Sequence, residues 1–166
     1  MQREKLLAEL LTKDTSEHSL DVSDIESHYA NLRVEMLREV DNEILGYAVQ
    51  AKYLIDYYFG EKKRLHEING GKFGYIYPRI RYEKTRGNLT VIWVKHMLAK
   101  NAKANSHLRK GNKQFRYPDT AFKSALDWER RLINEVEDNF ESIRLKVNGL
   151  VKIRASLRSQ AELENK

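Results

Sequence analysis

Basic side chains interleaved with aromatic rings are concentrated in the middle of the chain, where they could bind a polyanion. Residues 61–116 contain fifteen Lys and Arg against three Glu, whereas the rest of the chain contains fifteen bases and twenty-one acids. The central stretch therefore carries a net charge of +12 and the remainder −6, which together give the +6 of the whole chain. Positive charge segregated on an otherwise acidic protein is typical of nucleic-acid binders. The distribution thus indicates electrostatic binding to a phosphate backbone.

The segments that must position these bases have the composition of a β-hairpin. Residues 74–82 and 89–96 are rich in β-branched and aromatic residues, and Gly87 and Asn88 between them suit a tight turn. Pro78 lacks an N–H for the ladder, which predicts an edge strand or a bulge. Side chains alternate between faces along a strand, so we expect an aliphatic face against a helix and an Arg/aromatic face outward. One face of the first strand carries Tyr75, Tyr77, Arg79 and Arg81, and its other face carries Ile76, Pro78, Ile80 and Tyr82. One face of the second strand carries Leu89, Val91, Trp93 and Lys95, and its other face carries Thr90, Ile92, Val94 and His96.

Four basic residues near the hairpin tip are the strongest candidates for contact with DNA: Arg79, Arg81, Lys84 and Arg86. A two-stranded ribbon fits the major groove of B-DNA, where Arg can read guanine. The Lys and Arg side chains of the following loop would contact phosphates. The alternative is a solvated strand edge whose charges discourage aggregation. The rings of the hairpin, Trp93 among them, either close the core or stack on bases, and both interpretations stay open. The predicted nucleic-acid-binding residues are Arg79, Arg81, Lys84, Arg86, Trp93, Lys95, Lys100, Lys103, Arg109, Lys110, Lys113 and Arg116.

Two long amphipathic helices are expected to carry the hairpin. Ser23 begins a capping-box sequence, and an apolar stripe continues to about residue 67, with Gly60 or Asn69-Gly70-Gly71 as candidate stops. A second stripe begins at Asp119 or Thr120 and passes through Gly149, with Glu129 and Arg154 at polar positions of the stripe. Each helix would span about 44 residues, or roughly 65 Å.

The predicted fold is therefore α+β, mostly α, with two antiparallel helices flanking a central basic hairpin. Residues 1–22 are predicted to form a short amphipathic helix and a linker, and residues 23–166 the α-ββ-α DNA-binding domain. Residues 99–116 are polar and are predicted to form a mobile loop, and the charged tail 159–166 is predicted to fray.

The sequence holds few of the patterns that enzymes use. It contains no cysteine, no P-loop, no Rossmann glycine pattern and no GxSxG, and its five histidines are scattered. Acids such as Glu135, Glu137 and Asp138 are expected on a solvated helix face. We therefore expect no catalytic residue, no metal and no cofactor. No apolar run approaches the roughly 20 residues of a membrane span and no signal peptide is apparent, so a cytoplasmic protein without membrane contact is expected.

Residues 75–150 contain the short strings Pro78-Arg-Ile-Arg81, Leu89-Thr-Val-Ile-Trp93, Tyr117-Pro118, Trp128-Glu129, and Phe140 followed by Ile143-Arg144. Together these strings resemble the MobI-type auxiliary proteins of conjugative plasmids and integrative elements. The resemblance implies a DNA-processing accessory factor that acts at the origin of transfer and helps a separate relaxase to recognise or open that site. It supplies no catalytic or base-reading residues.

Three other functions fit the same residues. An RNA-binding accessory module would use the same charge and stacking, and a helical scaffold would present its positive loop to an acidic protein. A nuclease would combine dispersed acids with a divalent metal. The length of the second apolar stripe also leaves room for self-association, and a two-fold dimer on double-stranded DNA would match a palindromic site.

Overall fold

The computed structural model describes residues 22–83, 88–96, 106–111 and 115–164. The chain divides into two compact units, Met1–Met36 and Leu37–Lys166, and the candidate site belongs entirely to the second. The helix predicted near the N-terminus lies outside the described residues. In the described ranges, no helix combines the length and the apolar character that a membrane span requires.

Helix α2 (Val22–Ile68, 47 residues) agrees closely with the predicted helix of residues 23–67. It ends where two glycines adopt positive φ, 69° at Gly70 and 73° at Gly71, a conformation that glycine tolerates best. The Asn69 and Gly71 amides donate to carbonyls of the last helical turn at 3.0 Å. Of the two candidate stops, Asn69-Gly70-Gly71 is therefore confirmed, and Gly60 lies within the helix.

Helix α3 (Asp127–Glu164, 38 residues) begins later than predicted. A short 3₁₀ turn, η1 (Asp119–Phe122), occupies the predicted first turn and inserts Phe122 into the core, so the chain must turn again before α3 can begin. The tail that was predicted to fray from residue 159 is part of α3 as far as Glu164. Its last turn contains Ala, Leu and Glu, which are strong helix formers.

The predicted hairpin is present as β1 (Ile76–Glu83) and β2 (Asn88–Lys95), paired antiparallel with Ile76 opposite Lys95. A third strand, β3 (Ser106–His107), pairs with the other edge of β2. The Leu108 amide extends this pairing by donating to the Trp93 carbonyl at 2.9 Å. Part of the predicted mobile loop is therefore ordered against β2, because backbone groups at a strand edge need hydrogen-bond partners.

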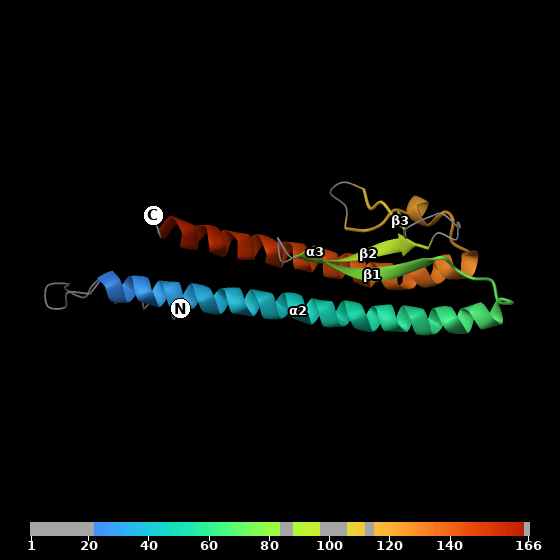
Figure 1. The fold of residues 1–166 in the computed structure, drawn as a ribbon, viewed down its shortest axis with the longest axis horizontal. Helices are drawn as coiled ribbons and strands as arrows, with labels where there is room; N and C mark the ends of the chain where they lie inside the picture. The colour runs from blue at the N-terminus through green and yellow to red at the C-terminus, as the bar shows by residue number, and fades with distance from the viewer. Residues whose placement is uncertain (1–21, 84–87, 97–105, 112–114, 165–166) are drawn as a thin grey trace, which may run out of the picture. The chain divides into compact units, whose positions relative to one another are not determined.

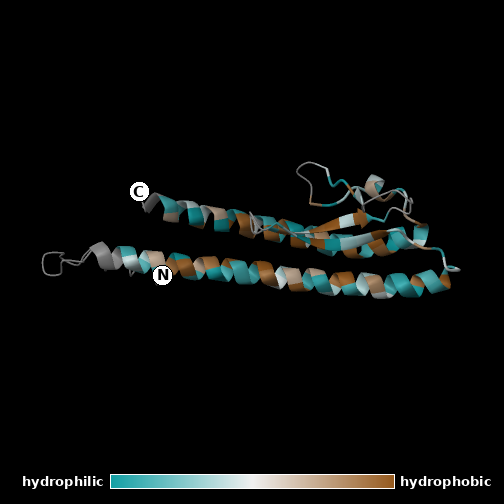
Figure 2. Cartoon of the chain, in the orientation of Figure 1, coloured by the Kyte–Doolittle hydropathy of each residue, from teal (hydrophilic) through white to brown (hydrophobic). Residues whose placement is uncertain are grey.

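Within the second unit, α3 runs antiparallel to α2, with the sheet packed against them (Figure 1). Contacts near opposite ends fix this direction: Arg154 donates to Asp41 at 2.9 Å, and Lys62 pairs with Glu129 at 3.0 Å. In Figure 2, β2 is largely hydrophobic whereas much of β1 is hydrophilic. The predicted α+β fold, mostly α, is thus confirmed, with a sheet of three strands in place of two.

Trp93 of β2 lies at the centre of the core and is fully buried. Its ring meets the rings of Tyr58, Phe122 and Phe140 edge-on, at centroid distances of 5.4, 5.5 and 5.8 Å. Edge-to-face contacts of this kind add to the free energy of apolar burial. Both helices and the 3₁₀ turn therefore converge on one side chain of the hairpin.

Candidate nucleic-acid interface

Arg79 and Arg81 lie on the outer face of β1, the edge strand of the sheet, and both are exposed. Their partners across the ladder are Ile92 and Thr90. No ion pair is found for either arginine within the described part of the chain. The inner face of β1 is buried at Ile76, as the alternation predicted. The outer face therefore presents two guanidinium groups to solvent, side by side along one strand.

Two predicted binding residues of β2 lie on the opposite face. Lys95 is paired with Ile76, so it belongs to the inner side of the sheet, where it is half-buried. The interpretation of Trp93 as a base-stacking surface residue was wrong, because its ring is enclosed by the core and its indole N–H donates to Glu137 at 2.6 Å. Alternation along β2 shows which side chains share a face with Trp93, but it does not show whether that face is buried. The packing of the helices against the sheet determines this.

The basic residues predicted in the loop have different environments. Arg109 is exposed. Lys110 lies 5.5 Å above the ring of Phe115, and burial lowers its pKa. Arg116 donates to Asp138 and, at 3.3 Å, to Glu141, so it is already engaged in a surface ion-pair network. The remaining predicted residues, Lys84, Arg86, Lys100, Lys103 and Lys113, lie outside the described residues.

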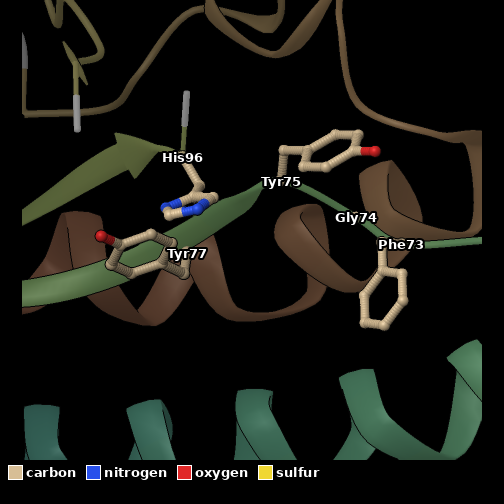
Figure 3. A pocket seen from close by; sticks show the side chains of 5 residues that line it. All are labelled: Phe73, Gly74, Tyr75, Tyr77 and His96. Atoms are coloured by element: carbon tan, nitrogen blue, oxygen red, sulfur yellow. The ribbon is translucent and has the colours of Figure 1, made fainter. Parts of the chain in front are cut away.

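An aromatic pocket of about 430 Å³ opens where the chain enters β1. Phe73, Tyr75, Tyr77 and His96 line it together with Gly74 (Figure 3). The His96 and Tyr77 rings lie beside each other, Tyr75 stands apart from them, and Phe73 points toward α2 (Figure 3). None of these residues was among the binding residues predicted from the sequence, although base stacking was one of the two interpretations of the hairpin rings. The signal was present in the row of aromatic residues that follows the helix stop.

A second, smaller pocket of about 230 Å³ shares part of this lining. Phe73 and Gly74 belong to both pockets, so the two are neighbours on one surface. The smaller pocket adds lysines of the last turns of α2 to the aromatic surface. It is lined by Phe59, Lys62, Lys63, His66, Phe73, Gly74 and Trp128.

The backbone of Ile76, the first residue of β1, is held by both helices. Its carbonyl accepts hydrogen bonds from the Tyr58 hydroxyl at 2.8 Å and from the Lys62 ammonium at 2.5 Å. Its amide donates to Glu129 Oε1 at 3.0 Å, and that oxygen also pairs with Lys62 at 3.0 Å. A Cβ added at Gly74 would overlap the Glu129 carboxylate. This clamp fixes the entry to β1 and hence the side chains that line the aromatic pocket.

The groups of the clamp are removed from water, and their pKa values respond accordingly. Burial lowers the pKa of Lys62, although Glu129 opposes this effect. Burial, followed by the charge of Glu129, raises the pKa of Tyr58 well above its usual value. Both shifts follow from the cost of placing a charge where it is poorly solvated.

A second buried anchor holds β2 and the segment before η1 against α3. Glu137 accepts hydrogen bonds from the Trp93 indole, from the Tyr117 amide at 2.8 Å, and from the Arg144 guanidinium. Arg144 in turn donates to the Phe115 carbonyl at 2.5 Å. The expectation that Glu137 lies on a solvated helix face was therefore wrong. Its seven-residue spacing from Arg144, on the side of the apolar stripe, was the available signal.

Residues 47–158 match a protein-family model described as MobI protein. The chain belongs to the MobI family. This finding confirms the resemblance seen in the sequence and extends it into α2. The family match includes both buried anchors, the outer face of β1 and the aromatic pocket. Membership of the MobI family indicates a mobilisation-related accessory protein. Neither the curated proteins nor the solved structures contain a match.

Proposed function

We propose that this MobI-family protein is a non-catalytic DNA-binding accessory factor that acts at a conjugative origin of transfer and assists a separate relaxase. The observation that carries the proposal is the exposed pair Arg79 and Arg81 on the outer face of an edge strand. The family assignment supports the biological setting. The concentration of positive charge in residues 61–116 supports a polyanion as the ligand.

The geometry of the hairpin suits entry into a groove. No further strand pairs with β1 in the described sheet, so its arginines can approach DNA without displacing another element. In the described sheet β3 pairs only with Val94 and Lys95, so the part of the hairpin that carries Arg79 and Arg81 is two-stranded. A two-stranded ribbon fits the major groove, and one bidentate Arg contact to guanine supplies about 1–3 kcal/mol of discrimination against the wrong base. Contacts to phosphates add affinity that weakens with salt. The hairpin would thus supply specificity, while neighbouring Lys and Arg side chains supply affinity.

The rigidity of the sheet supports the same role. The Ile76 clamp and the Glu137–Arg144 anchor connect β1 and β2 to both helices through buried hydrogen bonds. A hairpin that is already held in place by the core loses little conformational entropy when it binds DNA. The arginines therefore project from a prepared surface, as a sequence-reading element requires.

The test is a fluorescence-anisotropy titration at two salt concentrations. Duplex DNA from the transfer origin of the mobile element is compared with scrambled duplex of equal length and with structured RNA. We expect tighter binding to origin DNA. Arg79→Ala with Arg81→Ala should reduce the preference for origin DNA. The matched control, Lys152→Ala with Arg158→Ala, removes two exposed charges of α3 and should leave that preference intact.

Each alternative function predicts a different result. Equal binding of origin and scrambled DNA would reduce the protein to a backbone binder, and stronger binding to RNA would favour an RNA-binding module. Absence of binding to any nucleic acid would favour the protein scaffold. Cleavage of DNA by the protein alone with magnesium or manganese would contradict the non-catalytic assignment. Stimulation of relaxase nicking by the wild type, but not by the double Arg variant, would support assistance at the origin.

A further inference from the structure

We propose that the pocket lined by Phe73, Tyr75, Tyr77 and His96 holds an unpaired base of single-stranded DNA beside the duplex contacted by β1. This inference rests on the proposed function and deepens it, since it adds opened DNA to the substrate class. The base would stack on the pocket rings while the arginines of β1 hold the adjoining duplex. The site would then recognise a junction between paired and unpaired DNA.

The first observation is that large aromatic rings remain exposed around a hollow of suitable size. Phe73 is 67% exposed and Tyr75 37% exposed. The volume of about 430 Å³ falls within the roughly 300–1,000 Å³ of ligand sites. The His66 ring, 4.1 Å from that of Phe73 by centroids, leaves Phe73 facing solvent, whereas Tyr77 is half-buried beside Phe59 of α2, at a centroid distance of 6.2 Å. Exposed rings grouped at a hollow are typical of a binding surface.

The second observation is the positive charge around the rings. Lys63 and Lys72 are exposed beside the pocket, one in the lining of the neighbouring hollow and the other directly before Phe73. The carboxylate below Gly74, that of Glu129, is buried and is paired with a lysine, so it adds little negative charge to this surface. A base with its phosphates complements this combination, because stacking needs rings and the backbone needs cations.

The third observation is that the pocket continues into the arginine row. Tyr75, Tyr77, Arg79 and Arg81 alternate along one strand and therefore lie on the same side. At about 3.3 Å per residue, Tyr75 and Arg81 stand about 20 Å apart along the strand. One strand of B-DNA advances about 3.4 Å per nucleotide, so this row spans about six nucleotides. One polynucleotide can contact both ends of the row.

The backbone around the pocket is held in place before any ligand binds. The His96 amide donates to the Tyr75 carbonyl at 2.7 Å, and His66 Nδ1 lies 3.1 Å from the Lys72 carbonyl. The Ile76 clamp holds the next residue of β1. Preorganised rings lose little entropy on stacking, which favours binding of a base over collapse of the pocket.

The test compares a short mixed-sequence duplex with the same duplex carrying a single-stranded thymidine tail, by fluorescence anisotropy. The wild type should bind the tailed duplex more tightly. Phe73→Ala with Tyr75→Ala should weaken binding of the tailed duplex by about 5- to 150-fold, the range for loss of one stacked base. Binding of the blunt duplex should change little. Tyr75→Phe keeps the ring and should retain the preference, and Tyr53→Ala, which removes an exposed ring of α2, is the matched control.

A readout on the wild type keeps the test independent of variant folding. With 2-aminopurine in the tail, its fluorescence should change on binding because the base stacks on a ring, whereas 2-aminopurine within the duplex should respond less. Equal affinity for tailed and blunt duplex, or equal weakening of both by the double variant, would overturn the inference and leave the duplex-binding proposal standing. Binding to neither probe would refute both. Tighter binding to a tail of RNA than to one of DNA would overturn the assignment of DNA as the ligand.

Discussion

Replacing Glu129 by Ala should destabilise the fold by breaking the clamp at the start of β1. The Glu129 side chain is 1% exposed and that of its partner Lys62 is 15% exposed. The substitution would leave the Lys62 ammonium without its carboxylate and the Ile76 amide without its acceptor. Both losses fall on buried groups, so water can replace the missing partner only in part.

The magnitude follows from these two losses. A buried amide without an acceptor costs about 1–3 kcal/mol, and breaking a fully buried ion pair costs about 3–5 kcal/mol. Lys62 keeps its bond to the Ile76 carbonyl and reaches solvent in part, which reduces the second cost. With about 2 kcal/mol for the amide and the second cost reduced to about 1 kcal/mol, we expect the free energy of unfolding to fall by about 3 kcal/mol. Combining Glu129→Ala with Lys62→Met removes the unpaired charge and should recover about half of this loss.

The assay is urea-induced unfolding followed by circular dichroism, with the slope of the transition checked for each variant. Glu135→Ala is the matched control, because it removes an exposed carboxylate of the same helix whose partner is the exposed Tyr57 hydroxyl. Its effect should be much smaller. If Glu129→Ala lowers the stability no more than Glu135→Ala does, the clamp does not hold β1 in solution and the reasoning is refuted.

Three further predictions concern stability, pH and salt. Gly74→Ala should destabilise the fold by about 1–3 kcal/mol, since its Cβ would overlap the buried carboxylate of the clamp; Gly60→Ala, within α2 and with open space around it, should instead stabilise slightly in the same urea assay. Because the pKa of Tyr58 is raised in the folded state, stability present below pH of about 10 should be lost above it, at up to about 1.4 kcal/mol per pH unit. Tyr58→Phe should lack this part of the loss when unfolding is compared at pH of about 9 and 11, and equal pH dependence would contradict the prediction. Arg109→Ala with Lys110→Ala should weaken binding to all DNA sequences alike. The slope of log affinity against log salt should become shallower by about one unit for each phosphate that is no longer neutralised. Loss of sequence preference would instead show that these two residues read bases.

The local elements of the fold followed from the sequence, because short-range rules decide them. The Asn69-Gly70-Gly71 stop was recognisable since positive φ is a property of single residues. The alternation that places Arg79 and Arg81 on one face depends only on strand geometry. The resemblance to the MobI family was likewise carried by short strings, and the family match confirms it.

The candidate site was only partly predictable, because its other features depend on distant partners. Trp93 alternates correctly along β2, yet the choice between core and surface required Tyr58 and Phe140, each more than thirty residues away. Glu137 has the character of a charged surface residue until the strands bring an indole N–H and a backbone amide to it. The aromatic pocket likewise depends on the side-by-side placement of the two ends of the hairpin.

The sequence by itself determined the class of the protein: two amphipathic helices, a basic hairpin and a segregated positive charge. These are properties of composition and of periods of two or of three to four residues, which adjacent residues impose on one another. Only the tertiary structure decided which polar groups are buried, where α3 begins, and which rings remain exposed. The physical reason is that the burial of a charge is favourable only when hydrogen-bond partners converge on it, and the partners of Glu129 and Glu137 come mostly from other elements of the chain.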